Sequence, residues 1–86
     1  MKSAWKDTTS YSRGECRAPR EWTLEVGGLR LVVHHIHGLG DEWFGTCHTL
    51  GIRDRPLSAD IELAKMEFVD LVREWVCRHA RLLEKL

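Results

Sequence analysis

A pair of glycines between two alternating segments is the feature that most constrains the fold of this chain. Residues 22–26 and 29–33 alternate apolar and polar side chains over most of their length, and Gly27 and Gly28 separate them. A two-residue hairpin turn needs positive φ at its central residues, and glycine adopts such angles without steric strain. The pattern therefore predicts a β-hairpin over residues 21–36.

The glycine turn also fixes which residues face each other across the predicted hairpin. One apolar face then consists of Trp22, Leu24, Val26, Leu29, Leu31 and Val33. On the other face Glu25 lies opposite Arg30, and we expect an ion pair between them. A slip of one residue would mix the two faces, so the pattern specifies this register strongly.

Residues 42–50 are expected to form a third strand, for which the sequence leaves two registers open. A five-residue loop after the hairpin would place on the apolar face Trp43, Gly45 and Cys47. A four-residue loop would place there Phe44, Thr46, His48 and Leu50. We favour the first register, because tryptophan and cysteine are buried in proteins more often than histidine and threonine.

A long C-terminal helix is predicted over residues 59–85, which contain neither glycine nor proline. Ser58 is a favourable N-cap, and Asp60 is favourable in the first turn. Apolar residues recur along the segment at steps of three and four, which is typical of a helix that packs one face on a sheet. Residues 51–57 are expected to be a loop that leads into this helix.

The predicted helix is longer than the sheet that it would cover. Its 27 residues would span roughly 40 Å, whereas strands of five to eight residues span about 17–27 Å. We therefore expect its last three turns to project beyond the sheet and to expose a dimer or docking surface. This surface consists of Trp75, Val76, Leu82, Leu83 and Leu86. The alternative is that residues 1–20 fold back over it.

Residues 1–20 are polar and irregular, and Trp5 and Tyr11 are their aromatic side chains. We expect a loosely attached arm with Trp5 on the core, or alternatively a binding arm or an extra edge strand. Residues 21–86 would then form one α+β domain. In it a sheet of three antiparallel strands, or four with the arm, packs against the long C-terminal helix.

The composition narrows the classes of function. The chain of 86 residues has 13 basic and 13 acidic side chains, so its formal charge is zero. General nucleic-acid-binding proteins usually carry a basic excess, because phosphate neutralisation drives their affinity. Three cysteines, an odd number, favour reduced thiols over a disulfide framework, and no apolar run approaches the ~20 residues of a membrane span. We therefore expect a cytoplasmic protein with no membrane partner.

Histidine and cysteine residues indicate a metal site only weakly. In the favoured register, His35, His37 and Cys47 would share one face, and Cys16 or Cys77 could supply a fourth zinc ligand. No CxxC pair occurs in the sequence, and no HxxxH pair occurs on the predicted helix. We accordingly expect no cofactor, and a small zinc-binding protein is an alternative.

A nucleophilic site is not expected either. Cys47 and His48 are neighbours on a predicted strand, so their side chains point to opposite faces. Cys77 and His79 diverge by roughly 200° around the helix axis. The sequence therefore predicts a protein that is not an enzyme.

Charged residues before and on the helix are the candidates for a partner-binding surface. The set consists of Arg53, Asp54, Arg55, Arg73, Arg78 and Arg81. Arginine pairs well with carboxylates and phosphates, so such a set fits a mixed-charge interface. The simpler interpretation is a solvated loop and a solvated helix face.

Three stretches of the sequence, WTLEVGGLRLVV, DEWFGTC and SADIELAK, resemble small phage and prophage proteins with a hairpin, a Trp-containing strand and a helix. Some of these proteins are anti-CRISPR or other anti-defence inhibitors that bind host effector complexes and block them sterically. The resemblance implies a non-catalytic inhibitor of a host protein complex, acting in the host cytosol. The same order of elements also resembles HicB-type antitoxins, which implies a toxin-binding or nucleic-acid-binding module as the alternative.

Overall fold

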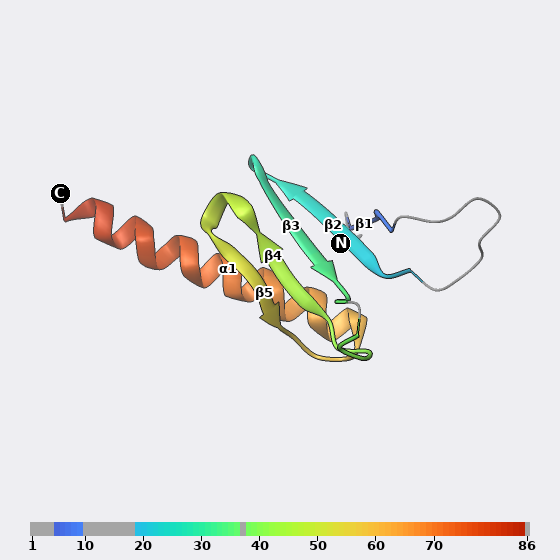
Figure 1. Cartoon of the computed structure of the whole chain (residues 1–86). Helices are drawn as coiled ribbons and strands as arrows, with labels where there is room; N and C mark the ends of the chain where they lie inside the picture. The colour runs from blue at the N-terminus through green and yellow to red at the C-terminus, as the bar shows by residue number, and fades with distance from the viewer. Residues whose placement is uncertain (1–4, 10–18, 37, 86) are drawn as a thin grey trace.

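The computed structural model describes residues 5–9, 19–36 and 38–85 of the chain. Within these residues, an antiparallel sheet of five strands carries one helix on one of its faces (Figure 1). The elements are β1 (Lys6–Asp7), β2 (Glu21–Val26), β3 (Leu29–His34), β4 (Phe44–Cys47), β5 (Ile52–Pro56) and α1 (Ile61–Glu84). Neighbours in the sheet are also neighbours in sequence. The α+β class is confirmed, but the expected number of three or four strands is wrong.

The predicted hairpin forms in the predicted register. Strands β2 and β3 pair residue by residue from Glu21 opposite His34 to Val26 opposite Leu29. Gly27 and Gly28 adopt φ angles of 53° and 81° in the turn. Glu25 lies opposite Arg30, but the two side chains form no ion pair. Both are exposed to water, where such a pair gains little over solvation.

Strand β4 takes the favoured register, but it is shorter than residues 42–50. Val33 lies opposite Gly45, and both Trp43 and Cys47 join the core beneath the helix. The segment His48–Leu50 forms a single 3₁₀ turn instead of continuing the strand. Gly51 ends this turn with a φ of 72°, which reverses the chain.

Strand β5 occupies most of residues 51–57, which were expected to form a loop. This strand was not among the three or four that the sequence predicted. It pairs with β4 through a bulge, because Asp54 has a φ of 46° and interrupts the ladder between Ile52 and Arg55. Pro56 fits because β5 is an edge strand and a proline needs no hydrogen-bond donor there. The strand is therefore held by its pairing and not by apolar alternation.

The opposite edge of the sheet is the short strand β1. Lys6 and Asp7 pair with Thr23 and Trp22, so this part of the expected irregular arm is an added edge strand. Trp5 packs against the core, as one of the two expectations for the arm had it. Tyr11 lies outside the described residues.

Helix α1 begins two residues later than expected, and its N-cap is Asp60 and not Ser58. The Asp60 carboxylate accepts hydrogen bonds from the backbone N–H groups of Glu62 (2.9 Å) and Leu63 (3.4 Å). The hydroxyl of Ser58 instead accepts from the N–H of Asp60, at 3.3 Å. Both residue types cap helices well, so the sequence alone does not separate the two positions.

Replacing Asp60 with alanine is expected to lower the free energy of unfolding by about 1 kcal/mol, because two N–H groups of the first turn lose their acceptor. Urea denaturation followed by tryptophan fluorescence measures this difference. Asp60→Asn should keep most of the stability, and Ser58→Ala should cost less than Asp60→Ala. A larger loss from Ser58→Ala would place the N-cap at Ser58.

The core lies between α1 and the middle strands. Ala64, Phe68 and Val72 of α1 are buried against Leu31 and Val33 of β3. Toward the β2 edge, Lys65 is also buried, and its Nζ lies 3.9 Å from the centre of the Trp22 ring in a cation–π contact. One line of helix residues, about one turn apart, thus anchors the first half of α1 on the sheet.

Gly45 sets how closely the helix approaches β4. A Cβ atom at this position would lie 2.6 Å from Cε1 and 2.8 Å from Cγ of Phe68. The Phe68 ring, which is fully buried, therefore occupies the place of a side chain on β4. Absence of a side chain at Gly45 is what lets the ring and the sheet meet.

The second half of α1 projects beyond the sheet. Its 24 residues span about 36 Å, whereas the six-residue strands β2 and β3 span about 20 Å. Figure 1 shows the C-terminal turns clear of the strands, at the opposite end of the molecule from β1. Val72 is the last buried residue of the helix as described. We call residues 75–85 the overhang.

Candidate binding groove between strand β5 and helix α1

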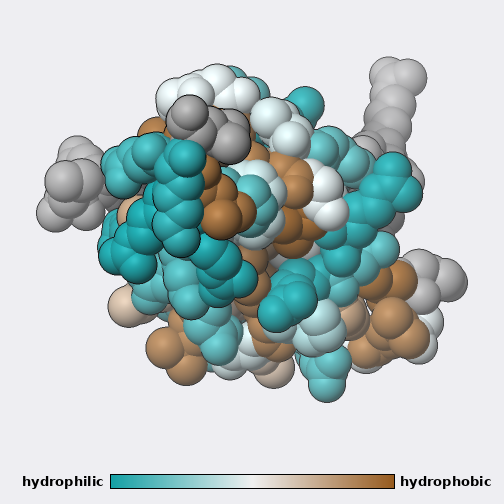
Figure 2. Space-filling view, turned by 90° about the vertical axis from the view of Figure 1, so that its left-hand side faces the viewer, coloured by the Kyte–Doolittle hydropathy of each residue, from teal (hydrophilic) through white to brown (hydrophobic). Residues whose placement is uncertain are grey.

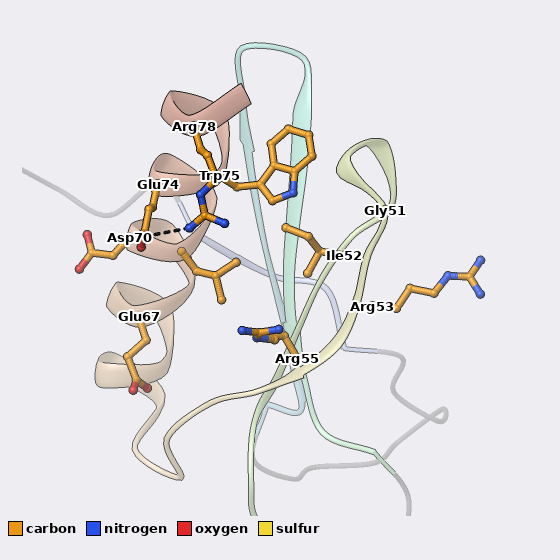
Figure 3. A pocket seen from close by; sticks show the side chains of 10 residues that line it. Gly51, Ile52, Arg53, Arg55, Glu67, Asp70, Glu74, Trp75 and Arg78 are labelled. Atoms are coloured by element: carbon orange, nitrogen blue, oxygen red, sulfur yellow. Dashed lines mark hydrogen bonds and ion pairs between the residues drawn. The ribbon is translucent and has the colours of Figure 1, made fainter. Parts of the chain in front are cut away.

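A groove of about 810 Å³ lies between the edge strand β5 and helix α1 (Figure 3). Its apolar lining comes from Ile52, Leu71 and Trp75. Six charged side chains surround these residues, namely Arg53, Arg55, Glu67, Asp70, Glu74 and Arg78. The groove leads along α1 toward the overhang, because Trp75 and Arg78 belong to both.

Local geometry explains which side chains line the groove. Leu71, Trp75 and Arg78 are spaced by four and three residues, so they lie on one side of α1. In β5, the pairing of Ile52 with Cys47 and of Arg55 with Gly45 turns both side chains toward the helix. The bulge between them is what brings an arginine to this face.

Three of the six predicted partner-binding residues meet at this groove: Arg53, Arg55 and Arg78. In Figure 3 the Arg55 side chain points toward α1, whereas Arg53 points away from the groove at its rim. The other three predicted residues lie elsewhere. Asp54 belongs to the opposite face of the sheet, Arg73 is exposed on the helix, and Arg81 is exposed on the overhang.

The carboxylates of the groove are already engaged. Glu67 accepts a hydrogen bond from the backbone N–H of Ser58 at 2.8 Å. Asp70 pairs with Arg73 at 3.6 Å, and Glu74 pairs with Arg78 at 3.0 Å. By contrast, Arg53 and Arg55 form no ion pair with any residue that the structure describes. Of the charged side chains that point into the groove, Arg55 is therefore the one with neither a hydrogen bond nor an ion pair to the described residues.

The overhang exposes an apolar stripe that continues the sheet-facing side of α1. Val76, Leu82 and Leu83 are 41%, 55% and 69% exposed. The His79 ring stacks on Trp75 at a centroid distance of 3.5 Å, and its Nδ1–H donates to the Trp75 carbonyl at 2.8 Å. Leu86, also predicted for this surface, lies outside the described residues.

Figure 2 looks at the molecule from the side on which the helix projects. Hydrophobic side chains are exposed in the middle of this end, and hydrophilic side chains border them. An apolar area with a charged border is the common composition of a protein-binding surface.

A cluster of His34, Thr46 and Asp54 lies on the face of the sheet opposite the helix, and sequence reasoning missed it. The Thr46 hydroxyl accepts from the backbone N–H of Asp54 at 3.1 Å and lies 3.0 Å from Nε2 of His34. Nδ1–H of His34 donates to the carbonyl of His35 at 3.2 Å. The cluster fixes the bulge of β5, and only the pairing of β4 with β5 reveals it.

This cluster does not have the geometry of a nucleophilic site. Thr46 and Asp54 both approach Nε2 of His34, the latter at 3.4 Å. A catalytic histidine takes a proton from the nucleophile on one ring nitrogen and is oriented by a carboxylate on the other. Here the second nitrogen is held by a backbone carbonyl.

The weak metal candidates do not converge where the structure describes them. Nδ1 of His35 bonds the carbonyl of Glu42 at 3.0 Å, and its ring lies on Trp43 with centroids 3.8 Å apart. Cys47 is fully buried in the core, and Cys77 is exposed on α1. No group of three potential ligands occurs among the described residues, and His37 and Cys16 lie outside them.

Comparisons with protein-family models, with curated proteins and with solved structures gave no match. Over the residues that the structure describes, no helix is both long and apolar enough to cross a membrane.

Proposed function

We propose that this protein acts by binding another protein and not by catalysis. The observation that carries the proposal is the overhang, in which the apolar stripe of α1 continues past the sheet with Val76, Leu82 and Leu83 exposed. Apolar area of this kind costs free energy in water, roughly 25 cal/mol for each Å² that a partner could cover. A surface that binds a partner recovers this free energy on association.

The position of the stripe supports the same proposal. About three helical turns without a sheet beneath them gain little stability from packing, and short isolated helices are marginal in water. Contact with a partner would stabilise both the helix end and its exposed side chains. Steric inhibition requires a surface that binds the partner and needs no reactive groups.

The resemblance to small phage proteins makes a host protein complex in the cytosol the first class of partner to test. In that role the protein would occupy a surface of the complex and block it sterically, as an anti-defence inhibitor. The formal charge of zero favours a protein partner over nucleic acid, whose binding gains from a basic excess. A homodimer through the overhang is the alternative use of the same stripe.

Replacing Leu82 and Leu83 together with glutamine is expected to abolish partner capture, because it removes the apolar stripe and keeps good helix formers. The matched control is Leu63→Gln with Met66→Gln, which changes two exposed apolar residues on the opposite side of the same helix. Both variants should keep the circular dichroism and melting temperature of the unmodified protein within a few degrees.

The measurement is a tagged capture from bacterial lysate with and without nuclease, quantified by mass spectrometry for all three proteins. A protein complex that the Leu82/Leu83 variant loses and the Leu63/Met66 variant keeps, with nuclease present, supports the proposal. Equal capture by both variants, or capture that nuclease abolishes, contradicts it. Light scattering on the purified proteins distinguishes the homodimer from a complex with another protein. If the unmodified protein and the Leu63/Met66 variant are dimers and the Leu82/Leu83 variant is a monomer, a second copy covers the stripe.

A further inference from the structure

We infer that the groove between β5 and α1 binds an acidic amphipathic helix of the partner protein. The inference rests on the proposed function and gives the chemistry of the bound segment. It follows from the charges that line the groove, from the edge of β5, and from the spacing of side chains along α1.

Charge is the first argument. The groove carboxylates Glu67, Asp70 and Glu74 already have partners, whereas Arg55, whose side chain points toward α1, has none among the described residues. Farther along the groove side of α1, Lys85 adds another basic side chain. A segment with carboxylates at its flanks would pair with the free guanidinium group of Arg55 through charge-assisted hydrogen bonds.

The carboxylates of the groove also discriminate between classes of partner. A phosphate backbone carries a negative charge at every step and would meet Glu67, Asp70 and Glu74 along the helix wall. A protein segment can place a carboxylate next to Arg55 and its apolar side chains next to the helix. Mixed charge in the groove thus favours a peptide over nucleic acid.

The edge of β5 argues against an added strand. Pro56 has no N–H group, and the N–H of Asp54 is used by the hydroxyl of Thr46. Asp54, with a φ of 46°, also interrupts the regular ladder. An edge of this kind does not extend a sheet readily, so the bound segment must be recognised through side chains.

Side-chain spacing along α1 then favours a helix. The groove side of α1 carries residues at alternating steps of four and three, namely Leu71, Trp75, Arg78, Leu82 and Lys85. This is the spacing by which two helices pack side by side. Its apolar members would contact apolar residues of the bound helix, while Arg78 and Lys85 extend the basic border.

The test uses a display library of short helical peptides with leucine fixed at heptad spacing and glutamate, lysine or glutamine at the flanking positions. Selection on the full-length protein is expected to enrich glutamate over lysine at those flanks. Arg55→Glu should weaken the selected peptides about tenfold or more, the scale of one lost charge-assisted hydrogen bond. Arg30→Glu, an exposed arginine on the opposite face of the sheet, should leave their affinity unchanged.

Changes in the amide chemical shifts of the protein on adding a selected peptide show where the peptide binds. Changes centred on Gly51–Arg55 and on the Leu71–Arg78 part of α1 support the inference. Enrichment of lysine, no enrichment at all, or shifts confined to other surfaces would overturn it. The proposed function is judged separately, since lysate capture that depends on Leu82 and Leu83 would stand even when the groove selects no acidic helix.

Discussion

Replacing Phe68 with alanine is expected to cost about 3–5 kcal/mol of unfolding free energy, the usual loss for a buried phenylalanine. The ring is fully buried between α1 and the sheet, and it fills the space above Gly45 that no other side chain occupies. A chain of 86 residues has a total stability of roughly 4–13 kcal/mol, at 0.05–0.15 kcal/mol per residue. The variant should therefore lose a large part of its stability.

Urea denaturation monitored by tryptophan fluorescence and by circular dichroism measures the loss. The matched control is Met66→Ala, since Met66 is on the same helix but 63% exposed, and its loss should stay within about 0.5 kcal/mol. Comparable losses from the two substitutions would mean that α1 does not pack on the sheet through Phe68. Such a result would also detach the helix from the groove that it forms with β5.

The elements that sequence reasoning found are those specified by local chemistry. Gly27 and Gly28 fix the hairpin register, because only a two-residue turn joins the two alternating runs. The long helix follows from its apolar spacing and from the absence of glycine and proline over residues 59–85. For the hairpin and the helix, the residues within the element are therefore sufficient to predict it.

Strand β5 was missed, and β1 was only one of the alternatives for the arm, because the stability of both edge strands comes from pairing with residues distant in sequence. Strand β5 has the sequence IRDRP, in which charge and proline disfavour a strand, yet Thr46 of β4 holds the N–H of Asp54 and fixes the bulge. Strand β1 is only two residues long and lies in a polar segment. Neither has the alternation by which a strand is predicted.

The candidate groove was predictable only in part. Arg53 and Arg55 could be selected from the sequence as arginines before a helix, and Arg78 as a charged helix residue. That Arg55 turns toward α1 while Arg53 turns away depends on the bulge at Asp54, which shifts the alternation by one residue. The sequence thus identified the arginines as candidates, but it did not show which face of the sheet each arginine side chain occupies.

Replacing Gly45 with alanine is expected to cost about 1–3 kcal/mol, although it adds only one methyl group. The backbone of Gly45 is outside the positive-φ region, so its conformation alone would accept alanine. The cost arises from the Phe68 ring, because the new Cβ would lie within 3 Å of several of its atoms. Either the ring leaves its position or α1 moves away from β4.

A double-mutant cycle with Phe68→Leu identifies this cause. Leucine is smaller than the ring, so Gly45→Ala should cost less in the Phe68→Leu background, with a coupling energy of about 0.5–3 kcal/mol. Gly51→Ala is the matched control. Gly51 has a φ of 72° and open space around its Cβ position, so its cost of roughly 1–2 kcal/mol comes from the backbone and should not couple to Phe68. Equal coupling for both glycines would show that the close approach at Gly45 does not limit the packing of the helix, and the position of α1 over the groove would then need another cause.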